Sequence, residues 1–261
     1  MSYKINNIDL STFGITPIQQ SGQSLAVTGV FDFPNRKGET ERSWGTEIEQ
    51  FVSAADLEFE GRDISFKGLM RGTTRADILS KLTSLTTLCK SGTLTFETRV
   101  GIFQVFASGE IQVVELCDTV FIVEIKFRQN VVLFPTAPGV ATVGTGYKLA
   151  GYSFKSDFGI IVNSIAGRLN TASRIEVKTT DFYANINYRD LKDVKIGCTM
   201  LASNLPDLTN KMGRLHGLLS QPGLKTLTYP DGTTDGVYLK GGFIVSGITE
   251  YACQFTLNLR S

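Results

Sequence analysis

The chain is poor in the residues that most catalytic and metal sites require. Among its 261 residues there is a single histidine, His216, and the four cysteines form no Cys-x-x-Cys pair. These counts exclude most zinc architectures and leave any histidine-based triad dependent on one residue. No Gly-Lys dipeptide occurs, so the phosphate-binding loop of nucleotide hydrolases is absent too. Composition therefore points away from catalysis, and we expect no cofactor and no metal.

The chain also lacks an excess of charge and a long apolar run. It carries 26 Lys and Arg against 25 Asp and Glu, so no global field attracts nucleic acid or an anionic membrane. The longest uncharged segment, residues 129–147, is interrupted by two prolines and three glycines and predicts a linker, not a membrane helix. The first ten residues have no apolar core of a signal peptide. We expect no membrane insertion, and four buried, reduced cysteines.

Aromatic residues and glycine, in contrast, are plentiful. The chain has 17 Phe, 26 Gly and 42% hydrophobic residues, which is enough to build a core and excludes intrinsic disorder. Many glycines with only 7 prolines favour tight turns between short strands.

The two halves of the chain resemble each other. Tyr3-Lys4-Ile5 matches Tyr147-Lys148-Leu149, and Phe13-Gly14-Ile15 matches Phe158-Gly159-Ile160. Residues 63–88 align without a gap on residues 193–218, with identities at Asp63/Asp193, Met70/Met200, Asp77/Asp207, Lys81/Lys211, Leu85/Leu215 and Leu88/Leu218. We interpret this as a tandem duplication. It predicts a first domain over 1–134, a Pro/Gly linker over 135–146 and a second domain over 147–261.

Each half shows the same succession of patterns. An alternating stretch around residues 60–63 predicts a hairpin, and a helix follows it, with Thr74 and Asn204 as N-caps. Strands are predicted over 93–98, 103–107, 111–116 and 120–127, and over 225–229, 236–239, 243–247 and 252–259. The apolar stripes of the helices predict core packing: Ile78, Leu82, Leu85 and Cys89, and Leu208, Met212, Leu215 and Leu219. The predicted fold class is mainly β (α+β), with two similar β-sandwich or barrel domains, each carrying one helix on a sheet.

The halves differ most before the helix. Between Gly14 and Asp63 there are 48 residues, but between Gly159 and Asp193 only 33, and we assign the extra residues to a polar arm at 31–46. This segment is either a solvated hairpin tip with Trp44 folded back, or an arm that docks on a neighbouring subunit. In the second case Arg36, Lys37, Arg42 and Trp44 are the candidate contacts.

The other polar clusters have simpler interpretations. Residues 231–235 predict a hairpin turn, since a calcium loop would need different residues at its later positions. Gly144 and Gly146 belong to the linker, and His216 is expected to be a satisfied or surface histidine. A carboxylate pair for general acid–base chemistry is weakly indicated, because these side chains lie at strand edges and turns: Glu58, Glu60, Asp63, Asp190 and Asp193.

Three segments carry a resemblance to bacteriophage tail proteins. They are residues 3–15, residues 34–45 followed by 57–68, and Phe127-Arg128 at the end of a strand. Through them the chain resembles the distal tail protein family and the related tail tube and baseplate-hub proteins. The resemblance covers residues 3–130 directly and 147–261 through the internal repeat. Many family members carry a second domain of another fold that binds carbohydrate, and that property is not carried over to a repeated domain.

The resemblance implies a structural adaptor in the virion tail, assembled in the bacterial host cytoplasm. Such subunits form a ring that continues the DNA channel, with DNA only as passing cargo. The implied partners are the tail tube protein, the tape-measure protein, tail-tip or receptor-binding proteins, and other copies of the chain. The copies would form a hexameric ring or a trimer with pseudo-sixfold symmetry. The unequal arms and the hexameric family members favour the hexamer.

Two other classes stay open at this point. A stand-alone β-sandwich that binds carbohydrate or another surface would show several exposed aromatic residues on one face. An enzyme with a carboxylate site would depend on Glu58, Glu60, Asp190 or Asp193.

Overall fold

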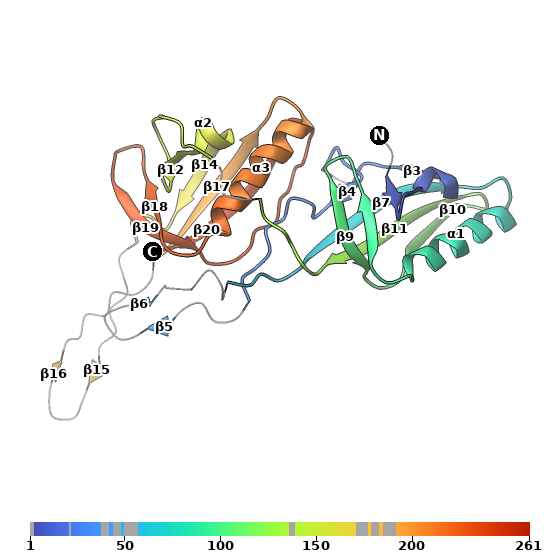
Figure 1. Ribbon diagram of the computed structural model, residues 1–261, viewed down its shortest axis with the longest axis horizontal. Helices are drawn as coiled ribbons and strands as arrows, with labels where there is room; N and C mark the ends of the chain where they lie inside the picture. Colours follow the sequence, from blue (N-terminus) through green and yellow to red (C-terminus); the bar gives the residue numbers. More distant parts are fainter. Residues whose placement is uncertain are drawn as a thin grey trace.

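The fold is described from a computed structural model of the chain (Figure 1). It describes residues 3–20, 22–37, 42–43, 48–49, 57–135, 139–170, 177–178, 183–184 and 192–261. Residues 42–43, 48–49, 177–178 and 183–184 are described by their backbone alone. They form two short antiparallel pairs, β5 (Arg42–Ser43) with β6 (Ile48–Glu49) and β15 (Val177–Lys178) with β16 (Tyr183–Ala184).

The first half of the chain supplies every strand of a nine-stranded antiparallel sheet. Its elements are β1 (Lys4–Ile5), β2 (Ile8–Asp9), the 3-10 helix η1 (Leu10–Phe13), β3 (Ile15–Pro17), β4 (Val27–Thr28), β7 (Arg62–Arg71), α1 (Arg75–Cys89), β8 (Leu94–Glu97), β9 (Ile102–Ala107), β10 (Gln112–Cys117) and β11 (Val120–Gln129). The strand order is β2-β1-β8-β9-β11-β7-β3, with β10 beside β11 and β4 beside β7.

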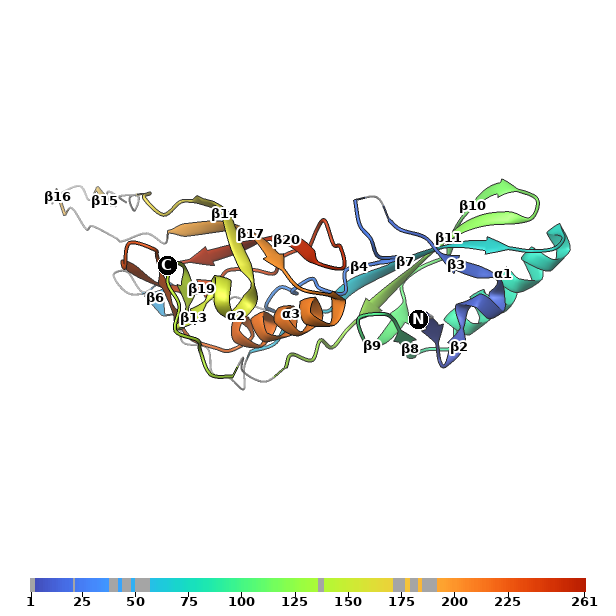
Figure 2. The ribbon, with the colours of Figure 1, turned by 90° about the horizontal axis from the view of Figure 1, so that it is seen from above.

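The second half forms a seven-stranded sheet of the same design. Its elements are β12 (Lys148–Leu149), β13 (Tyr152–Ser153), α2 (Phe154–Phe158), β14 (Ile160–Ala166), β17 (Asp193–Leu201), α3 (Leu205–Leu219), β18 (Lys225–Thr228), β19 (Thr234–Leu239) and β20 (Ala252–Arg260). Its order, β13-β12-β18-β19-β20-β17-β14, matches the first sheet strand by strand. The mainly β fold with two β-rich domains is thereby confirmed (Figure 2). The domain boundaries stay a prediction; residues 139–146 of the expected linker contain no helix or strand.

The two long helices begin as the sequence predicts. The side chain of Thr74 accepts the N–H of Asp77, and Asn204 accepts that of Asp207, which satisfies a backbone donor at each N-terminus. Each of these aspartates also pairs with the lysine four residues on, Lys81 or Lys211. In the first stripe Ile78, Leu85 and Cys89 are buried and Leu82 is half-buried, whereas all four residues of the second stripe are buried.

Three expectations about strands and cysteines were wrong. Residues 57–60 do not form a hairpin with 63–66; instead β7 starts at Arg62 and pairs with β11, β3 and β4, while Phe59 pairs with Arg36. Residues 243–247 are not a regular strand, because their two bridges go to different halves, Phe243 to Phe33 and Ser246 to Gln254. Cys117 is exposed on the edge strand β10, while the other three cysteines are buried.

Two matching turns, at Gly29 and Gly167, show how closely the halves agree. Both glycines have a positive φ, +79° and +83°, and the Cβ of an alanine would lie 1.9 Å from a backbone oxygen, that of Asp63 or Asp193. The N–H three residues on, in Asp32 or Asn170, bonds back to the glycine carbonyl. Only a residue without a side chain fits so close an approach.

These turns also correct the assignment of the extra residues. Fourteen residues separate Gly14 from Gly29 in the first half, but only seven separate Gly159 from Gly167 in the second. The difference arises because a loop joins β3 to β4 in the first half, whereas in the second half the single strand β14 covers the same stretch. Beyond the turns, the first excursion (residues 30–62) has 33 residues and the second excursion (residues 168–192) has 25. The arm at 31–46 therefore accounts for only part of the difference, and the argument for the hexamer from unequal arms is weakened.

The Gly167 turn makes a stability prediction. Gly167→Ala should lower the free energy of unfolding by clearly more than Gly223→Ala, measured by urea denaturation. Both glycines have nearly the same φ, +83° and +82°, which costs alanine about 1 kcal/mol. Nothing lies within 4 Å of a Cβ at Gly223, whereas at Gly167 the Asp193 carbonyl must move. Equal losses in the two variants would show that the carbonyl does not hold the turn.

Candidate functional site

The two halves meet along a short stretch of backbone pairing. Phe33 and Phe243 exchange both N–H···O bonds, at 2.9 and 3.0 Å. On either side of this pair, side chains of the first half accept N–H groups of the second: Asp32 Oδ1 from Val245 at 2.8 Å, and Asn35 Oδ1 from Gly242 at 2.7 Å. The start of the first excursion thus runs along residues 242–245 as an added strand would.

An aromatic cluster fills the space beneath this pairing. Phe33 lies 5.6 Å from Phe243 in a stacked arrangement and 5.4 Å from Phe59 in an edge arrangement, measured between ring centroids. Phe134 packs on Phe33 at 5.0 Å, and His216 of α3 on the same ring at 5.2 Å. Because the rings come from both halves, the hydrophobic core is continuous through the junction.

His216 is a member of this cluster, so of the two alternatives expected, a satisfied or a surface histidine, the surface position is wrong. It is buried, its ring bonds to the backbone of Phe31, and its Nε2 has no hydrogen-bond partner among the residues that the structure describes. Burial lowers the pKa of His216 to about 3, and the positive charge of Arg62 acts in the same direction. The His216 side chain is therefore a neutral ring that packs in the junction between the halves.

Arg62 holds the segment that crosses to the second half. Its Nη1 donates to the carbonyl oxygens of Val30 and Asp32 at 2.7 and 3.3 Å, and its Nε donates to Gln129 at 2.8 Å. Burial lowers the pKa of this guanidinium to about 10, against the attraction of the Asp32 carboxylate. The guanidinium also lies 5.3 Å from the Phe103 ring.

Of the four predicted arm contacts, two lie among residues whose side chains are described. Arg36 pairs through its backbone with Phe59; its side chain is half-buried, and within the described part of the chain its Nε and Nη2 have no hydrogen-bond partner. Lys37 is exposed and pairs with Glu58 at 3.2 Å. For Arg42 only the backbone pairing with Glu49 is described, and Trp44 lies outside the described residues. The docking role of these four residues stays a prediction.

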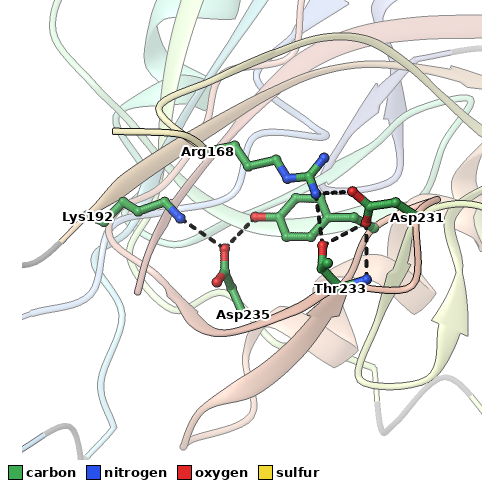
Figure 3. Close-up of polar contacts among 6 residues, drawn as sticks. Arg168, Lys192, Asp231, Thr233 and Asp235 are labelled. Atoms are coloured by element: carbon green, nitrogen blue, oxygen red, sulfur yellow. Dashed lines mark hydrogen bonds and ion pairs between the residues drawn. The ribbon is translucent and has the colours of Figure 1, made fainter. Parts of the chain in front are cut away.

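A polar network surrounds both ends of the second excursion, where the chain leaves and rejoins its sheet (Figure 3). The guanidinium of Arg168 lies 4.0 Å from the Tyr229 ring centroid and pairs with Asp231, which also accepts from Thr233. At the other end, Lys192 pairs with Asp235 at 3.2 Å, and the Tyr229 hydroxyl donates to the same carboxylate at 2.7 Å. Both ends of the excursion are thereby tied to the β18–β19 hairpin.

Each of the predicted carboxylates that the structure describes has a polar partner of its own. Asp63 pairs with Arg128, and Asp193 pairs with Arg260 and Lys240, which hold the pKa of Asp193 at about 2. Glu58 pairs with Lys37, Glu60 accepts from Asn35, and Asp190 lies outside the described residues. Within the part of the chain that the structure describes, no group of three or more His, Cys, Asp or Glu residues could hold a metal ion.

A groove of about 850 Å³ runs between the halves. Its walls are mostly polar and come from the start of β7, the end of β11, and strands β14, β17 and β20. None of the described helices is long and apolar enough to cross a membrane.

Comparisons with known proteins add little. No protein-family model matches the chain, and no curated protein matches it in sequence. Among solved structures it is similar to SPP1 Dit (gp 19.1), described as a paradigm of the hub adsorption apparatus in phages that infect Gram-positive bacteria. The identity is 9% and the TM-score 0.35, over 100% of this chain and 98% of that one. A likeness of this size does not establish a shared family or function.

Sequence reasoning missed the residues that join the halves. Phe33, Asp32 and Arg62 act through contacts with residues far away in the chain, which no local pattern reveals. One signal was present, however: Gly29-Val-Phe-Asp32 in the first half and Gly167-Arg-Leu-Asn170 in the second are the same turn.

His216 predicts a specific pH dependence of stability. Its folded pKa is about 3 and its unfolded value about 6.5, so as pH falls the unfolded chain takes up the proton first. The free energy of unfolding should therefore decrease between about pH 6.5 and 5, by about 1 kcal/mol per pH unit at the lower end. Chemical denaturation at each pH measures the slope. Because the chain has one histidine, His216→Phe should flatten it; an unchanged slope would contradict the assignment.

Arg168 should control the ionisation of Asp231 and leave that of Asp193 unchanged. Arg168 and the Thr233 donors hold the pKa of Asp231 at about 2, so Arg168→Ala should raise it towards its usual value. NMR titration of the carboxyl carbons measures the change. Asp193 is the matched control, since its pKa is also about 2 but is set by Arg260 and Lys240. A variant in which both pKa values rise, or neither does, would show that the pairing is not local.

Proposed function

We propose that this chain is a structural subunit of a phage tail, a ring-forming distal tail or baseplate-hub adaptor that joins the tail tube to the tail tip. The observation that carries the proposal is the repetition of one β architecture within the chain, with the same strand order and the same glycine turns. We interpret the repetition as a duplication. The resemblance of residues 3–15, 34–45 and 57–68 to distal tail proteins supports the same role.

Repeated β units with an excursion on each are suited to assembly. A ring forms when one patch on each unit meets a different patch on the next unit. Because the unit is duplicated, each chain supplies two units to such a ring. The near-neutral net charge of +1 suits a protein that lets DNA pass without binding it. In this proposal the tail tube protein, the tape-measure protein and the tail-tip proteins are its neighbours.

The ring is tested by mass and shape on one purified sample. Light scattering should give three or six times 28.5 kDa, and negative-stain microscopy should show a closed ring with a central hole wide enough for duplex DNA. A compact monomer that binds glycans on an array would contradict the proposal and favour the carbohydrate-binding module.

A deletion tests whether the first excursion is a contact between subunits. Residues 38–56 are replaced by a short Gly-Ser turn, which keeps the pairing of Arg36 with Phe59 and of Phe33 with Phe243. The expected product is a folded monomer with an unchanged thermal unfolding midpoint that no longer closes rings. Rings that persist unchanged would show that this excursion is not a subunit contact.

A further inference from the structure

The contact between the halves joins two surfaces that each have a counterpart elsewhere in the chain. One surface is the strand-like segment 243–246, which pairs with β20 through Ser246 and Gln254 and, on its other edge, with Phe33. The other surface is the start of the first excursion, residues 30–33, which follows the Gly29 turn. Each counterpart can be identified from the strand register.

The counterpart of segment 243–246 is the edge strand β10. Val114 pairs with Ile122 on β11, and Ser246 pairs with Gln254 on β20. β11 and β20 are corresponding strands of the two sheets, and the two pairings lie at the same position along them. Val113 therefore corresponds to Val245. Among the described residues β10 pairs with β11 alone. The other edge of β10 corresponds to the edge of segment 243–246 that pairs with Phe33, and in β10 this edge is open.

The counterpart of residues 30–33 is the start of the second excursion. Asn170 takes the place of Asp32, and both N–H groups bond back to the glycine of the same turn. Leu169 takes the place of Phe31, but Phe31 is 4% exposed at the junction and Leu169 is 89% exposed. Residue 171, which matches Phe33, lies outside the described residues.

Among the described residues, the chain thus uses one surface of each kind and leaves the other two open. Asp32 Oδ1 accepts the N–H of Val245, and the amide oxygen of Asn170 is equally able to accept the outward N–H of Val113. The two open surfaces cannot meet within one chain, because β10 and the end of β14 lie at opposite ends of the molecule (Figures 1 and 2). A second copy of the chain satisfies both.

We infer that copies of this chain associate head to tail, with residues 168–170 of one copy docking along the outer edge of β10 of the next, repeating between chains the contact that joins the halves within one. The inference rests on the duplication in the proposed function, and it names the contact that function requires. An exposed apolar edge strand is otherwise an aggregation hazard: Val114 and Leu116 of β10 are 56% and 57% exposed. A repeating contact between different patches builds a ring or an open chain.

Charged substitutions on each surface test the contact, each with a matched control. Leu169→Asp and Val113→Asp should each weaken association at least about tenfold, measured by mass photometry and analytical ultracentrifugation. Val140→Asp is the control for the first, because Val140 is 91% exposed and lies in the linker. Val114→Asp is the control for the second: its counterpart Ser246 is exposed, so the repeated contact does not cover it. Circular dichroism and thermal unfolding verify that each variant folds.

Mixing the two variants tests the head-to-tail geometry directly. Val113→Asp keeps residues 168–170 intact, and Leu169→Asp keeps the β10 edge intact, so each alone should be monomeric at concentrations where the tenfold loss of affinity prevents association. Together they should form a 1:1 heterodimer of twice 28.5 kDa that grows no further. Failure of the mixture to associate would overturn the inference, as would wild-type chain that stays monomeric at high concentration.

The outcomes separate this inference from the proposed function. Rings that persist in both Leu169→Asp and Val113→Asp would overturn the contact and leave the ring-forming function standing. Association that needs both surfaces but yields open chains with no central hole would support the contact and contradict the ring. Equal loss in Val114→Asp and Val113→Asp would indicate general adhesion of an apolar edge, and would also overturn the inference.

Discussion

The pairing of Phe33 with Phe243 is the contact on which the arrangement of the molecule depends. Two backbone hydrogen bonds and the rings beneath them convert two separate sheets into one continuous core. Arg62 binds the carbonyls of Val30 and Asp32, and the Asp32 carboxylate binds Val245, so both hold the crossing segment in place for this pairing. Without that segment, the edge of residues 242–245 that pairs with it would be open.

The same constraint explains the difference between the halves. Segment 243–246 is short and irregular because it divides its bonds between β20 and the first half. Its counterpart β10, which bonds to β11 alone among the described residues, is a six-residue strand with a bulge between Glu115 and Cys117. The two halves thus share one architecture, and the difference between segment 243–246 and β10 follows from what each of them contacts.

Local features could be predicted from the sequence, and distant ones could not. Thr74 and Asn204 cap their helices because the signal lies within four residues, and the apolar stripes follow from helical periodicity. The strand at 243–247, and the surface alternative for His216, were wrong for one reason: both are decided by Phe33 and its neighbours, about 200 residues away. The extra residues of the first half were assigned to the arm, because only the structure shows that β14 runs through the position of the β3–β4 loop.

The central claim is that each chain supplies two equivalent positions to one assembly. The rotational symmetry of top-view class averages, combined with the particle mass, tests it most directly. If the chain is a duplicated ring unit joined by repeated contacts, the number of lobes around the axis should be twice the number of 28.5 kDa chains. A particle with one lobe per chain, or with no rotational axis, would contradict the account.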